Sequence, residues 1–217
     1  VAHLRPEQIG KTLVLWVCIP LVILTPIAIW AMHRTDGRLV VLIGLFCLAM
    51  GSYLSTGLSP DWNGDSFRTI LVLQAAGQIL TFFPVIVLSV AHGNPKNGIA
   101  TGAYIQVMRL LTFQVAQSLL TTYIRKGEQA HSYLLGLHIE KGAQETSVAL
   151  AAFAHKVAGT GAALSQSRAT SLLSQWLQTQ ANVLSYIDAF WLTFFCALGA
   201  MVILAFVGKA PKGPLAP

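Results

Sequence analysis

The chain has 217 residues, of which 54% are hydrophobic and 10% are charged, and its formal net charge is +6. Soluble domains carry about 25% charged residues, and the mean hydropathy of +0.63 points the same way. This composition excludes an ordinary soluble domain and a disordered chain, and it favours an all-α integral membrane protein. The basic residues are scattered and form no patch interleaved with aromatic residues, so we expect no nucleic-acid partner.

Five stretches are long and apolar enough to cross a bilayer, which takes about 20 residues in a helix. The first stretch is too long for the apolar region of a signal peptide, so we interpret it as a span. The first part of the chain, 1–124, holds four predicted transmembrane helices, over 12–32, 39–58, 69–91 and 98–124. A final transmembrane helix is predicted over 189–208, followed by a tail over 209–217.

Between the fourth and fifth spans lies a polar to amphipathic stretch over 125–188. Leu172, Leu173, Trp176 and Leu177 form an apolar stripe at helical spacing, which predicts a helical hairpin at or outside the membrane surface. We favour a packing or lid role for this loop, with partner binding as the alternative. The loops on the two sides of the membrane carry equal numbers of Lys and Arg, so these charges alone do not indicate which side is cytoplasmic.

Arg109 is the most informative residue because it lies near the middle of the predicted span 98–124. An arginine at that depth costs roughly 2.5–3.5 kcal/mol on insertion scales and must face the bundle interior or water. At 100° per residue, Gln106 and Gln117 share its helix face. The pattern predicts that this face lines a polar substrate path or holds a conformational hydrogen-bond network.

The span 69–91 carries a second polar stripe at helical spacing. It consists of Gln74, Gly77, Gln78 and Thr81, at positions i, i+3, i+4 and i+7. We predict that these glutamines also line the path. The alternative is that they bond to a neighbouring helix, which contributes about 0.6 kcal/mol on average. Pro84 follows the stripe and is expected to kink the helix.

The sequence holds no catalytic motif, no paired carboxylates and no metal-ligand spacing, so we expect no enzyme, no metal site and no cofactor. The three cysteines lie in apolar stretches without CxxC spacing. One rival interpretation is a membrane enzyme or haem subunit that uses His33 and His92, which lie at the ends of spans.

Four short stretches resemble motifs of one family. The residues before the first span read LRPEQIG, and the loop after it reads HRTDGR, with Arg34 and Arg38 at the positions of a basic cytoplasmic loop and His33 replacing its usual acid. Arg109 lies in a helix that begins GIATG, and the last span is preceded by LSYIDAFW and followed by KAP. Together these residues resemble the C-terminal part of a major facilitator superfamily transporter, of the fourteen-helix drug:proton antiporter subfamily.

The resemblance implies a proton-coupled multidrug efflux transporter of the cytoplasmic (inner) membrane, with the tail in the cytoplasm and the 125–188 loop exported. It implies that the five spans are helices ten to fourteen of a major-facilitator C-terminal half. The partners would then be membrane lipid, the missing N-terminal half, a small amphipathic substrate and an accessory protein of the envelope. Alternating access would use a path lined by Arg109, Gln106 and Gln117, and charge pairs of Arg34, Asp36 and Arg38 at a cytoplasmic gate.

The main alternative is a complete five-span membrane scaffold or assembly subunit. Such a protein would bind its partner through the long loop and would carry no transport path.

Overall fold

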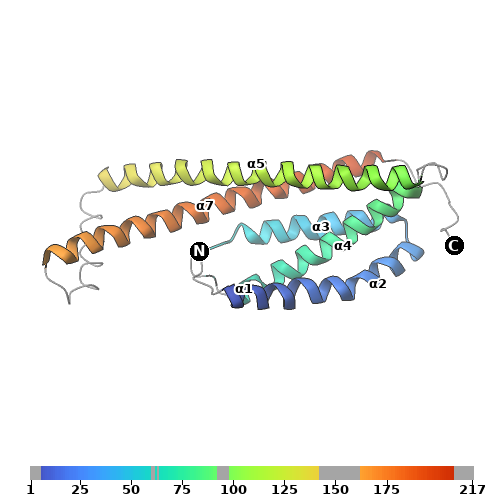
Figure 1. Ribbon diagram of the computed structural model, residues 1–217, viewed down its shortest axis with the longest axis horizontal. Coiled ribbons are helices and arrows are strands. Elements are labelled where there is room, and N and C mark those ends of the chain that lie inside the picture. Colours follow the sequence, from blue (N-terminus) through green and yellow to red (C-terminus); the bar gives the residue numbers. More distant parts are fainter. Residues whose placement is uncertain (1–5, 60–61, 63, 92–97, 142–161, 208–217) are drawn as a thin grey trace. The chain divides into compact units, whose positions relative to one another are not determined.

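A computed structural model of the chain describes residues 6–59, 62, 64–91, 98–141 and 162–207 (Figure 1). All regular secondary structure in these residues is helical. The elements are α1 (Pro6–Leu13), the π-helical turn η1 (Val14–Cys18), α2 (Ile19–Arg34), α3 (Gly37–Ser55), the 3₁₀ turn η2 (Gly64–Phe67), α4 (Arg68–Ala91), α5 (Gly98–Lys141) and α7 (Ala162–Phe206).

Four helical segments of the described chain are long and apolar enough to cross a membrane, namely Gly10–Arg34, Gly37–Ser55, Asp65–Ser89 and Ser171–Phe206. The protein is therefore a helical protein with the features of a multi-pass membrane protein. The predicted span 98–124 is helical within α5 but is not among the four, so the expected count of five is not met. Its arginine and several glutamines lower the mean hydropathy of this helix.

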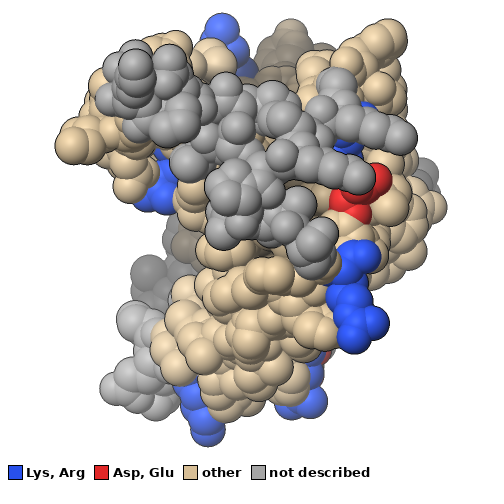
Figure 2. All heavy atoms as spheres, turned by 90° about the vertical axis from the view of Figure 1, so that its right-hand side faces the viewer, with Lys and Arg blue, Asp and Glu red and all other residues tan. Residues whose placement is uncertain are grey.

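Large apolar side chains cover much of the described surface. Val22 is 73% exposed, Phe46 is 60% exposed and Phe206 is 85% exposed. Figure 2 shows that uncharged side chains make up most of the coloured surface on the face it views. An apolar surface of this extent is unstable in water and is the normal outer surface of helices in lipid.

The chain divides into two compact units, and the division falls within α5 and within α7. One unit holds 120–189, and the other holds 2–119 together with 190–217. The boundaries predicted at 124 and 189 are not helix ends, because α5 runs on to Lys141 and α7 begins at Ala162. The charges of Arg125 and Lys126 do not stop a helix, which ends only where caps, glycine or proline interrupt its hydrogen bonds. The residues between α5 and α7 lie outside the described part of the chain.

The 120–189 unit is held by a close contact between α5 and α7. Ala181 and Ser185 on α7 are fully buried. A Cβ added to Gly127 on α5 would lie 3.2 Å from the Ser185 hydroxyl oxygen. The absence of a side chain at Gly127 therefore lets the two helices approach here, as small residues do in membrane helix pairs.

The other unit is built around α3 packed against α4, with α2 also packed against α4. A Cβ on Gly44 would lie 2.7 Å from the backbone carbon of Leu80, and one on Gly77 would lie 2.5 Å from the Cγ of Leu48. Both distances are shorter than any ordinary contact, so glycine is required at both positions. Pro84 is fully buried near this contact and lies inside α4 without ending the helix.

The first span contains one irregularity, the π-helical turn η1. The Ile19 amide donates to the Val14 carbonyl, five residues back, and Pro20 follows directly. Proline has no amide hydrogen and cannot complete the ordinary α-helical ladder, which accounts for a widened turn before it. Pro26 lies inside α2, directly after Thr25, whose hydroxyl donates to the Leu21 carbonyl.

Candidate functional site

Four helices of the 2–119 part of the chain enclose a hollow of about 500 Å³. Its lining is mostly apolar, with one amide, one hydroxyl and one guanidinium. We call it the Arg109 hollow, and its lining residues are Leu21, Leu48, Gln78, Ile79, Thr81, Phe82, Val85 and Arg109. Small-molecule sites have volumes of about 300–1,000 Å³ and this kind of lining, apolar with a few polar groups.

The guanidinium of Arg109 lies over the ring of Phe82, with its central carbon 4.9 Å from the ring centroid. This cation–π contact places the charge against an aromatic face in place of a carboxylate. The ion pairs within the described residues are Arg68 with Asp65 and His131 with Asp188, so none of them neutralises Arg109. Arg109, which is exposed, therefore has no carboxylate partner within the part of the chain that the structure describes.

The hollow lies about half-way along α3 and α4. Arg109 is 11 residues after Gly98, the start of α5, which is about 16 Å along an α-helix. Gln78 is near the middle of α4, and Leu21 is near the middle of the Gly10–Arg34 span. In a helix that crosses the hydrocarbon core of a bilayer, which is about 30 Å thick, a residue about 16 Å from one end would lie near the centre of the core.

The structure places the predicted path residues in three different surroundings. Arg109 and Gln78 both line the hollow. Gln74 packs against α3, where its Nε2 would lie 3.3 Å from a Cβ on Gly51. Gln106 and Gln117 are exposed on α5 and do not contribute to the lining.

Phe82 is a site residue that the sequence interpretation missed. It lies four residues after Gln78 and therefore one helical turn further along the same face of α4. That spacing was the available signal, but an apolar ring on an apolar helix is indistinguishable from a lipid-facing residue until its cationic neighbour is located.

The three charged residues of the predicted gate loop also differ in their surroundings. Arg34 lies over the ring of Trp30, 5.6 Å from the centroid. Asp36 occupies the N-cap position of α3, and its backbone carbonyl accepts the Leu39 amide at 2.8 Å. Within the described residues no ion pair joins Arg34, Asp36 and Arg38, so this conformation does not contain the predicted charge pairs.

Arg38 contributes to a second hollow, of about 360 Å³. Its Nη2 atom is buried and has no hydrogen-bond partner among the residues that the structure describes. The remaining lining is apolar apart from one serine, and comes from the start of α3, the end of α4 and the end of α7, with Val41, Val85, Leu88, Ser89, Leu204 and Val207. This second hollow thus lies at the helix ends near the predicted gate loop, while the Arg109 hollow lies at mid-length.

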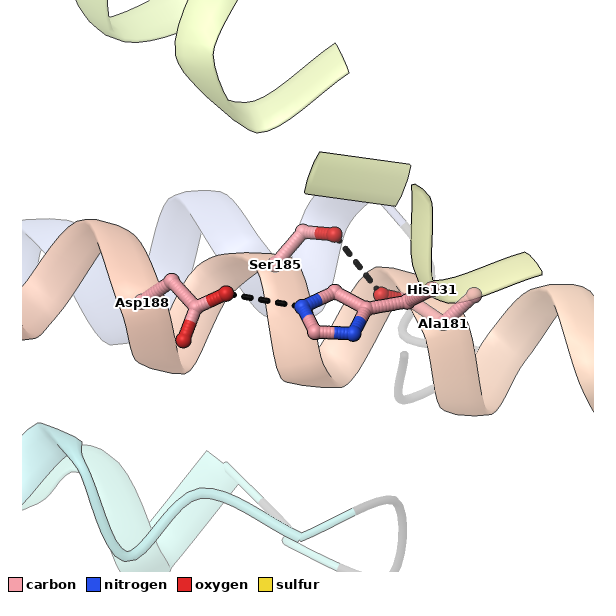
Figure 3. A network of polar contacts seen from close by, with 4 residues as sticks. All are labelled: His131, Ala181, Ser185 and Asp188. Carbon is pink, nitrogen blue, oxygen red and sulfur yellow. Dashed lines mark hydrogen bonds and ion pairs between the residues drawn. The ribbon is translucent and has the colours of Figure 1, made fainter. Parts of the chain in front are cut away.

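The 120–189 unit carries its own polar contact, drawn in Figure 3. The His131 Nε2 on α5 lies 2.7 Å from the Asp188 Oδ2 on α7, and one turn away the Ser185 hydroxyl donates to the Ala181 carbonyl. A longer bond of 3.4 Å runs from Gln178 Nε2 to Glu128 Oε1. Asp188 lies inside α7, where it binds a histidine of the neighbouring helix.

Among the residues the structure describes, no three His, Cys, Asp or Glu side chains converge on a point that would hold a metal ion. The Nδ1 of His33, one of the two rival haem ligands, lies 2.8 Å from the Ile29 carbonyl. His92 lies outside the described residues.

No family model, curated protein or solved structure matches the chain.

Proposed function

We propose that the chain is the C-terminal part of a proton-coupled multidrug efflux transporter that works by alternating access. The observation that carries the proposal is the Arg109 hollow, a ligand-sized space at mid-helix lined by an arginine and an amide. Charged residues inside membrane bundles mark substrate and ion paths. Transporters place their substrate sites near the bilayer midplane, between two helical halves.

In this proposal the hollow is one wall of a substrate path, and the facing wall belongs to the N-terminal half of the transporter. Arg109 and Gln78 orient the substrate, while Phe82 and the aliphatic residues provide an apolar contact surface. Arg34, Asp36 and Arg38 pair with charged groups of the gate in a state other than the one described. The coupling acids belong to the other half, and the protein resides in the cytoplasmic (inner) membrane.

The test is the export of Nile red, a neutral amphipathic dye, from cells that produce the protein from its own gene. The proposal expects export that stops when a protonophore dissipates the proton gradient. Arg109→Ala should lower the export rate about tenfold or more, because it removes a hydrogen-bond donor that would orient the carbonyl group of the dye. Arg125→Ala is the matched control, since Arg125 is exposed on the same helix outside the hollow.

Two results would overturn the proposal. One is dye export that persists unchanged in the protonophore. The other is equal export by the Arg109→Ala and Arg125→Ala variants at equal membrane abundance.

A second candidate, a membrane scaffold or assembly subunit, is favoured by one observation, the division of the chain into two compact units of which 120–189 is one. Under that candidate, Nile red export is the same with and without the gene, and replacing residues of the 120–189 unit releases a bound protein partner from the purified complex.

A further inference from the structure

We propose that the second hollow, which we call the Arg38 hollow, binds an anionic phospholipid of the surrounding membrane. In this proposal the lipid phosphate lies on the guanidinium of Arg38, and part of an acyl chain lies on the apolar lining. Such binding requires a membrane protein but not a transporter, so the inference goes beyond the proposed function and does not depend on it.

The first argument is the state of the Arg38 side chain. Its Nη2 atom is buried and has no hydrogen-bond partner among the residues that the structure describes. A buried N–H group without a partner is costly, and the cost is larger when the group is charged. An arginine at the end of a membrane helix normally extends its charged group to the interface and to water. A buried Nη2 at this position therefore points to an acceptor that comes from outside the described residues.

The second argument is the depth of the hollow. Arg38 lies in the first turn of α3, which has 19 residues and is therefore about 28 Å long, close to the thickness of a hydrocarbon core. Ser89 is the last residue of its span, and Val207 directly follows the last residue of the final span. The hollow thus lies at the ends of three spans, which is the depth of the phosphate groups of lipids.

The third argument is the lining, which is mostly apolar and open to the outer surface. Val41 of α3 is 2% exposed. Val85 of α4 is 43% exposed and Val207 after α7 is 42% exposed. All three lie in the unit that holds 2–119 and 190–217. A space of about 360 Å³ is smaller than a whole phospholipid, but it has room for a phosphate group and part of one acyl chain.

The polar groups of the lining leave recognition of the headgroup to Arg38. The other polar side chain is that of Ser89, whose hydroxyl donates to the Val85 carbonyl at 2.7 Å. The hydrogen of this hydroxyl is therefore already used within α4. A guanidinium binds phosphate oxygens through its planar set of N–H donors.

The charge of the adjoining segments favours an anionic headgroup over a zwitterionic one. Arg34 and Arg38 flank a single acid, Asp36, near the start of α3. The sequence segments 92–97 and 208–217, which follow α4 and α7, contain three lysines and no acid. Basic pockets between membrane helices are typical sites for anionic lipid headgroups. The ammonium group of phosphatidylcholine would instead meet like charges.

The test measures lipid binding to the full protein, produced from its own gene and purified in dodecyl maltoside, by native mass spectrometry. The probes are phosphatidylglycerol and phosphatidylcholine with the same dioleoyl chains. We expect phosphatidylglycerol to bind about tenfold more tightly, a factor that one charge-assisted hydrogen bond provides. Arg38→Gln should remove this preference by weakening the binding of phosphatidylglycerol.

Arg34→Gln is the matched control, because it removes the same charge from an exposed residue outside the hollow. It should weaken phosphatidylglycerol less than about twofold, since salt screens an exposed charge. Ser89→Leu is a second variant of the site. It retains every charge, places a larger side chain in the lining and should also weaken phosphatidylglycerol.

Equal binding of the two lipids by the unmodified protein would overturn the inference. Equal losses of phosphatidylglycerol in Arg38→Gln and Arg34→Gln would also overturn it, because they would reveal a general attraction to basic surface. If Arg38→Gln fails to accumulate, Ser89→Leu decides, and unchanged binding of phosphatidylglycerol by that variant would count against the site. Displacement of phosphatidylglycerol by inorganic phosphate at a similar concentration would identify a site for a free anion in place of a lipid and would overturn the inference.

Discussion

His131 on α5 and Asp188 on α7 join two helices that are far apart in sequence, with 2.7 Å between Nε2 and Oδ2. Both side chains are partly exposed, at 26% and 43%. Glycine at 127 and buried serine at 185 bring the helices together one turn away, so the pair lies at a close helix contact rather than on a free surface.

Replacing His131 by Ala should therefore loosen the 120–189 unit without unfolding the rest of the chain. A partly exposed hydrogen-bonded pair contributes about 0.5–1 kcal/mol. Amide hydrogen exchange around 127–135 should accelerate about two- to fivefold, as that free energy implies. In a double-mutant cycle with Asp188→Ala the two effects should be non-additive. Additive effects would mean that the contact contributes nothing to stability.

Gly44→Ala should destabilise the packing of α3 against α4. The added Cβ would lie 2.5 Å from the Thr81 hydroxyl oxygen and 2.7 Å from backbone atoms of α4, and backbone cannot rotate aside. Overpacking of this kind costs about 1–3 kcal/mol. The thermal midpoint in detergent should fall, while Gly199→Ala, with no atom within 4 Å of the new Cβ, should leave it unchanged or raise it. Equal midpoints for the two variants would contradict the close contact.

Thr81→Val should leave stability unchanged or increase it. The Thr81 hydroxyl oxygen is buried and has no hydrogen-bond partner in the described structure, and such a group costs about 1–3 kcal/mol. The control is Ser55→Ala, because the buried Ser55 hydroxyl donates to the Gly51 carbonyl at 2.8 Å. That variant should lose up to about 1 kcal/mol. A lower thermal midpoint for Thr81→Val than for Ser55→Ala would show that the Thr81 hydroxyl has a partner.

Arg34→Ala should slow the turnover of transport more than it weakens substrate affinity. We expect kcat to fall and KM to change little, because the residue lies at the predicted gate and away from the Arg109 hollow. The control is Trp30→Leu, which removes the aromatic ring under Arg34 and retains its charge. A rise in KM with an unchanged kcat would place Arg34 at the substrate site instead.

The positions of the first three spans could be predicted from the sequence because charged residues and loop residues flank them. The predicted 39–58 corresponds to Gly37–Ser55, and 69–91 corresponds to Arg68–Ala91. The ends of α5 and the start of α7 could not be predicted in the same way. A hydropathy pattern locates the part of a helix that lipid covers, but a helix ends only where its hydrogen bonds are interrupted, so α5 runs on beyond Ile124.

The candidate site was predicted in part. Helical periodicity grouped Gln78 with a polar face of its own helix, and the cost of a charge within a predicted span singled out Arg109. Both residues line the Arg109 hollow. Periodicity shows which residues share a helix face but not which neighbouring helix that face contacts. Gln74 was therefore grouped with Gln78, although Gln74 packs against Gly51 of α3. For the same reason Gln106 shares a predicted face with Arg109 and yet lies outside the lining.

The π-helical turn η1 fixes the rotational register of the first span. A π turn holds one more residue than an α turn, so the helix on one side is rotated by about 100° relative to an uninterrupted helix. Trp16 lies in this turn, and the guanidinium of Arg68 lies 5.0 Å from its ring centroid. A chain one residue shorter here, lacking Val17, would direct the indole away from Arg68. The direction in which the Trp16 ring points, toward Arg68 at the start of α4, thus depends on the number of residues in this turn.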